Sequence, residues 1–222
     1  MSLAVNAKAK DLRAVSAELR SMVSDGEVVI NDAAHLHGLC AGFKEGDITV
    51  KGDGGDYMGA LNDGATIRVK GNVGRYLADN MTRGTVLVDG SAGYGVGAYC
   101  YGGTIMVNGD AGDFTAVMNK GATIVVNGNV GDEVATYMLA GDLVIVGNAG
   151  KNLANYLIRG NVYVGGEWAS LGHNTLLAEM TADDVAKLRG YLAEYKIDAD
   201  PAAFHKIVRL SEKPFYQARK TA

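Results

Sequence analysis

The chain has 222 residues, of which 31 are glycine and only 2 are proline, and its formal net charge is −4. Hydrophobic residues make up 48% of the chain and charged residues 21%, a globular balance that excludes a flexible linker or a collagen-like protein. The acidic balance argues against a nucleic-acid partner, and two cysteines cannot form a disulfide framework, so we expect a cytoplasmic protein.

The first element in chain order is predicted to be a helix over Lys10 to Val23. Its apolar face is formed by Leu12, Val15, Leu19 and Met22. The residues before it lack the apolar core of a signal peptide, and no apolar run in the chain is long enough to cross a membrane. We therefore expect an N-terminal helical segment over residues 1–27 and no membrane partner. A strand is predicted over Val28 to Ile30.

Residues 28–174 are expected to form one repetitive unit, because glycine recurs there every 19 residues. The two glycine series are Gly52, Gly71, Gly90, Gly109, Gly128, Gly147, and Gly55, Gly74, Gly93, Gly112, Gly131, Gly150. Two aliphatic columns keep the same period and lie two residues apart, beginning at Ile48 and Val50. Since alternate residues share one face of a strand, the sequence predicts an all-β core, a single-stranded parallel β-helix of about seven coils.

The glycines are expected at the corners of the coils, where they would allow positive φ angles and close approach between neighbouring backbones. A column restricted to glycine and alanine, which includes Ala116, is expected at a tight turn against the next coil. A polar column is interpreted as turn residues that hydrogen-bond their own backbone. Its members are Asp53, Asn72, Ser91, Asp110, Asn129 and Asn148.

An apolar stripe is predicted on the outside of the coils. The residues between the two aliphatic columns should point away from the core, and five successive ones are apolar: Leu87, Met106, Val125, Val144 and Tyr163. Soluble proteins seldom expose such a stripe. It is therefore a candidate partner interface, and the alternative is that the N- or C-terminal segment of the chain covers it.

The C-terminal segment, residues 175–222, is predicted to hold a helix that Thr181 begins as N-cap. Helices at both ends of the chain are expected to cover the open ends of the β-helix, because those ends would otherwise expose unpaired strand edges. The remaining residues, Pro201 to Ala222, show little pattern and are interpreted as an arm.

No catalytic, cofactor-binding or metal site is predicted in this chain. The segment Gly93 to Gly97 lacks the full dinucleotide-binding pattern, and only Gly95 in it has no structural role. His35, His37 and Cys40 have a possible metal spacing without a fourth ligand, and their role stays open.

The repeat units resemble a known family. Units such as Gly64 to Gly74 and Gly121 to Gly131 are similar to the GXGXG domain, the C-terminal right-handed β-helix of the glutamate synthase large subunit. The same domain forms one of the subunits of formylmethanofuran dehydrogenase and of the related formyltransferase/hydrolase complex. In length and in its C-terminal exit, the chain looks most like the free-standing GXGXG subunit of N-methylglutamate synthases.

The resemblance implies a right-handed coil and a non-catalytic scaffold subunit in a hetero-oligomer. Its partners would be an amidotransferase-like subunit and an FMN-binding glutamate-synthase-like subunit, which would hold the FMN and an iron–sulfur cluster. The implied reaction is transfer of an amino or methylamino group into glutamate. The alternatives are the GXGXG subunit of a formylmethanofuran dehydrogenase or another formyl-transferring complex, and a self-assembling structural β-helix, whose filaments would need open ends.

Overall fold

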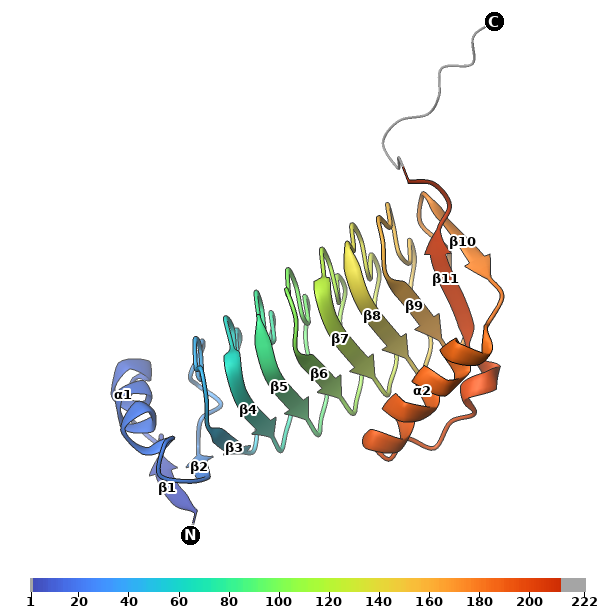
Figure 1. The fold of residues 1–222 in the computed structure, drawn as a ribbon. Helices are drawn as coiled ribbons and strands as arrows, with labels where there is room; N and C mark the ends of the chain where they lie inside the picture. The colour runs from blue at the N-terminus through green and yellow to red at the C-terminus, as the bar shows by residue number, and fades with distance from the viewer. Residues whose placement is uncertain (1, 213–222) are drawn as a thin grey trace, which may run out of the picture.

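The computed structural model describes residues 2–212, and it shows a parallel β-solenoid of about seven turns with two α-helices (Figure 1). The strands are β1 (Leu3–Asn6), β2 (Val28–Asn31), β3 (Asp47–Lys51), β4 (Asp63–Val69), β5 (Arg83–Val88), β6 (Thr104–Val107), β7 (Lys120–Val126), β8 (Ala140–Ile145), β9 (Asn161–Val164), β10 (Thr175–Ala178) and β11 (His205–Arg209). The helices are α1 (Leu12–Met22), α2 (Ala182–Glu194) and the short 3-10 helix η1 (Pro201–Ala203).

The predicted 19-residue register is confirmed. Strands β1 to β9 pair in chain order and in parallel, and Ile67 of β4 lies beside Ile48 of β3 and Val86 of β5. Both aliphatic columns point inward and are fully buried from Ile48 to Val162 and from Val50 to Val164, apart from a trace of exposure at Val88. Stacking like side chains along the rod therefore builds one continuous core.

Each coil turns through a segment in which every second residue is left-handed. In one such turn φ is 57° at Tyr76, 56° at Ala78 and 55° at Asn80. The backbone N–H groups of these residues bond alternately to the next coil and to the previous one, since Tyr76 donates to Tyr94 and Ala78 donates to Met58. Left-handed backbone is costly for residues other than glycine, and these coil-to-coil bonds offset the cost.

Gly95 has a place in this pattern. Its φ of 75° makes it the equivalent of Tyr76 one coil later, so it is the first left-handed residue of its turn. A Cβ at Gly95 would lie 2.8 Å from the ring of Tyr76. The position is therefore structural, because glycine both adopts the positive φ angle and leaves room for the Tyr76 ring.

The explanation of the two glycine series by positive φ angles is wrong for all members but Gly52. The members other than Gly52 share a requirement for space, because the previous coil lies against them. A Cβ at Gly112 would meet the carbonyl carbon of Gly93 at 2.8 Å, and one at Gly131 would meet the backbone nitrogen of Asp113 at 2.7 Å. The positive φ angles belong mainly to another, looser series, such as Gly84 and Gly141.

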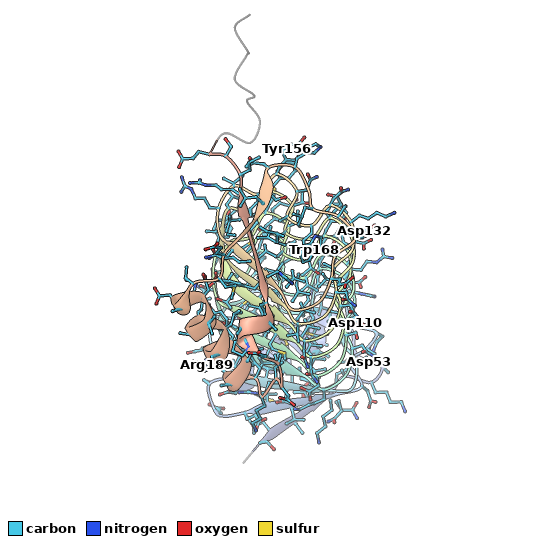
Figure 2. The ribbon with its side chains drawn as sticks, turned by 90° about the vertical axis from the view of Figure 1, so that its right-hand side faces the viewer. Asp53, Asp110, Asp132, Tyr156, Trp168 and Arg189 are labelled. Carbon is cyan, nitrogen blue, oxygen red and sulfur yellow. The ribbon has the colours of Figure 1, made fainter. Side chains whose placement is uncertain are left out.

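The polar column is also corrected, because its side chains bond the next coil and not their own turn. The Oδ1 atom of Asp53 accepts from the N–H of Asn72 at 2.7 Å, and Oδ1 of Asn72 accepts from the N–H of Ser91 at 2.9 Å. Each member thus supports its equivalent one coil later. Figure 2, which looks along the solenoid from its C-terminal end, shows Asp53 and Asp110 of this ladder on one side of the coils.

Replacing Asn72 with alanine should lower the free energy of unfolding by about 0.5–1.5 kcal/mol, because the N–H of Ser91 loses its acceptor. Asn127→Ala is the matched control, since the amide of Asn127 donates to the exposed side chain of Asn108. Urea unfolding of both variants checks this. Equal stability losses in the two variants would mean that the ladder carries no coil-to-coil support.

The two ends of the solenoid are closed in different ways. At the N-terminal end, β1 adds a strand to β2, and α1 places Val15 and Leu19 in the core. At the other end, β11 pairs antiparallel with β9, and β10 pairs antiparallel with β11. The expectation that a helix covers this end is wrong, because α2 lies across the lateral face of the strands (Figure 1). The rest of the predicted arm, residues 213–222, lies outside the described residues.

Among residues 2–212, no helix is long and apolar enough to span a bilayer.

Candidate partner-binding surfaces

The candidate interface on the outer sheet face, here called the outer stripe, comprises Leu87, Met106, Val125, Val144 and Tyr163. The structure places its last four residues below α2 and the segment after it, in one buried cluster. Val125, Val144 and Tyr163 are fully buried, and Leu87 packs at the edge of the cluster. The stripe is therefore not an exposed partner surface. The alternative interpretation holds, because the chain's own C-terminal segment covers these residues. The covering residues are Leu188, Leu192, Ile197 and Phe204.

The polarity of the outer face changes where this cover ends. Before Leu87, the outward column holds Thr49 and Arg68. The Thr49 hydroxyl donates to Glu27 at 3.0 Å, and the guanidinium of Arg68 pairs with Asp47 at 3.0 Å. From β5 to β9 every member of this column is apolar, and the last four of these residues lie under the cover.

A buried polar cluster, here called the Asp184 cluster, fixes the start of α2 to the sheet. The Asp184 carboxylate accepts from Nζ of Lys206 at 2.8 and 2.9 Å and from the Tyr163 hydroxyl at 2.6 Å. It also completes a capping box with Thr181. Burial opposes ionisation of this carboxyl, but the bonds from Lys206, Thr181 and Tyr163 outweigh it and hold its pKa well below the usual range.

A second polar contact fixes the middle of α2. The Asp142 carboxylate on β8 accepts from Nζ of Lys187 at 3.1 Å, from the Tyr191 hydroxyl at 3.0 Å and from the Asn161 amide at 3.0 Å. Neither this contact nor the Asp184 cluster was predicted. The pairs that join α2 to the strands lie 21 to 49 residues apart in the sequence, and no local pattern joins them.

Aromatic side chains collect on the turns, which form an exposed edge of the rod here called the turn ridge. Tyr57 stacks on Tyr76 with centroids 4.9 Å apart, Tyr76 meets Tyr94 at 5.3 Å, and Tyr94 meets Phe114 at 5.1 Å. The ring of Tyr94 thus continues the row at the coil where Gly95 has no side chain. Tyr156, which stacks on Tyr137 in a second column of the turns, lies in Figure 2 on a different side of the coils from Asp53 and Asp110.

The structure separates the three residues of the possible metal spacing. The Nε2 atom of His35 lies 3.0 Å from the carbonyl of Lys10, while Nδ1 of His37 accepts from the N–H of Asp56 at 3.0 Å. Cys40 is fully buried, and burial raises the pKa of its thiol to about 12. Over residues 2–212, no group of three potential metal ligands is found.

Comparison with known proteins gives one finding. A family model described as the GXGXG motif matches residues 30–199, which covers the solenoid from β2 through α2. No curated protein matches the chain.

Proposed function

The chain belongs to the GXGXG motif family, and from this premise we propose that it is a non-catalytic scaffold subunit of a glutamate-synthase-like enzyme complex. The family is associated with glutamate-synthase-like proteins. The proposal rests on the extent of the family match, which includes nearly every coil and the helix on the outer face. What this chain shares with the family is the whole rod and not a local site.

The proposed reaction of the complex is transfer of an amino or methylamino group into glutamate, as in an N-methylglutamate synthase. An amidotransferase-like subunit and an FMN-binding subunit would supply the chemistry, with FMN and an iron–sulfur cluster held by these partners and none by this chain. The role of the present chain is to hold the two partner subunits at a fixed separation and orientation.

The construction of the solenoid suits that role. Its turns are joined coil to coil by backbone hydrogen bonds, and its corners by side-chain ladders. Seven coils at the usual strand spacing give a rod about 30 Å long. A rod whose surface groups are fixed in this way can orient two bound subunits without losing much conformational entropy when they bind.

The proposal predicts that the purified chain carries no flavin and has no group-transfer activity by itself. Co-expression with the amidotransferase-like and FMN-binding subunits should give one complex of fixed stoichiometry, measured by size-exclusion chromatography with light scattering. Stoichiometric FMN on the isolated chain would contradict the proposal. Stable association with an amidohydrolase-like metal subunit would instead assign the chain to a formyl-transferring complex.

A further inference from the structure

One coil in the middle of the rod carries no ionisable acidic or basic side chain other than tyrosine and cysteine. From Gly90 to Gly109, more than a full repeat, the sequence has no Asp, Glu, Lys, Arg or His, although charged residues make up 21% of the chain. The coils on either side are charged, as Arg75, Asp79 and Asp113 show. The core of a protein–protein interface has the same composition, because it is depleted in charged residues and enriched in aromatic ones.

The uncharged coil exposes aromatic residues in its turn and just after it. Tyr101 is 56% exposed and Tyr99 is 38% exposed, which places them among the most exposed large hydrophobic residues of the described chain. Three partly buried side chains lie on the same turns: Tyr94, Phe114, whose ring centroid is 5.1 Å from that of Tyr94, and Met118, the equivalent of Tyr99 one coil later. We call these five residues the aromatic patch: Tyr94, Tyr99, Tyr101, Phe114 and Met118.

The patch is held rigid by the solenoid. The backbone of Tyr99 is left-handed, with φ 58°, and its N–H donates to Val117 of the next coil at 2.9 Å. The N–H of Tyr101 donates to Met81 of the previous coil at 2.8 Å. Because the backbone beneath these rings is already ordered, a partner that contacts them loses little conformational entropy of this chain.

The cation at the patch is Lys120. Its ammonium is 3.9 Å from the ring centroid of Tyr101 and 5.9 Å from that of Tyr99. No carboxylate within residues 2–212 forms an ion pair with it, and its ammonium lies against the Tyr101 ring instead. A carboxylate is therefore the complementary group for Lys120.

We propose that the aromatic patch with Lys120 is the docking site for a partner subunit that presents an apolar side chain beside an aspartate or glutamate. The apolar group would pack on Tyr99 and Tyr101, and the carboxylate would pair with Lys120. A second copy of this chain fits less well, because a two-fold contact centred on the patch would bring two Lys120 ammonium groups together. The choice of partner rests on the proposed function.

The test measures binding of the purified full-length chain to the purified amidotransferase-like and FMN-binding subunits, singly and together, by isothermal titration calorimetry. The patch variants are Tyr101→Ala and Lys120→Glu. Their controls are Leu177→Ala, which truncates another exposed apolar side chain, and Arg189→Glu, which reverses a charge on the exposed side of α2 (Figure 2). Circular dichroism and thermal unfolding establish that each variant is folded.

Each patch variant should raise the Kd for one partner about tenfold or more, with both controls close to wild type. A partner Asp or Glu to Lys change should restore binding to Lys120→Glu. If the wild-type chain binds and the patch variants bind equally well, the docking site is elsewhere while the proposed function stands. If the wild-type chain binds neither subunit, both proposals fail. Self-association that Tyr101→Ala abolishes would replace the partner subunit by a second copy.

Discussion

Replacing Asp184 with alanine is expected to lower the free energy of unfolding by about 3–5 kcal/mol, the usual cost of removing one partner from a buried ion pair. The side chain of Asp184 is only 7% exposed and that of Lys206 only 16%. Alanine would leave the Lys206 ammonium and the Tyr163 hydroxyl buried without their acceptor, and it would remove the capping box of α2. Urea unfolding measures the loss.

Asp183→Ala is the matched control, because Asp183 lies in the same first helical turn and is exposed. This change should lower the free energy of unfolding by no more than about 1 kcal/mol, because it removes only the favourable interaction of the carboxylate with the helix dipole. Since the pKa of Asp184 is lowered in the folded state, its contribution is complete above the ordinary carboxyl range and is lost as pH falls toward the folded pKa. The difference between wild type and Asp184→Ala should therefore shrink in acid. A difference that grew in acid would contradict this account of the cluster.

Ala116→Leu is expected to destabilise the protein by about 1–3 kcal/mol or more, because the solenoid has no space at the inner side of the turn. Ala116 is fully buried, with φ 61°. At the equivalent position one coil earlier, Gly97, even a Cβ would lie 2.9 Å from Cδ1 of Ile105. A leucine at Ala116 would have to displace the aliphatic side chains that fill the core.

The control for this change is Ala186→Leu, since Ala186 is an exposed residue of α2 where leucine is a good helix former. Thermal unfolding of the two variants should show a clear loss of Tm for Ala116→Leu and little change for Ala186→Leu. An unchanged Tm for Ala116→Leu would mean that the glycine and alanine column does not face the core.

The sequence predicted the strands well because each coil repeats one pattern. A column that keeps β-branched residues over seven coils predicts a stacked parallel strand, and the pairing of Val50 with Val69 confirms it. The turns were not predicted in the same detail. Left-handed backbone at Tyr57 and Tyr76 has no signature in residue type, because bonds to neighbouring coils and not local preference hold it.

The position of α2 was not predicted, since the apolar outer stripe was interpreted as a candidate partner interface and a cover by the chain's own terminal segments was only the alternative. Contacts such as Asp142 with Lys187 decide it, and they connect segments 45 residues apart. The aromatic patch differs in this respect. Its uncharged coil is visible in the sequence, but its meaning depends on the exposure of Tyr101 and on the Lys120 ammonium beside it, which forms no ion pair among the described residues.

The central claim is that this chain acts by assembling other subunits, and the most direct test is the activity of those subunits with and without it. Purified amidotransferase-like and FMN-binding subunits are mixed, and transfer of the amino or methylamino group into glutamate is measured while the chain is added. We predict that transfer rises with added chain and saturates at a fixed stoichiometry. Full transfer in the absence of the chain, unchanged when it is added, would contradict the claim.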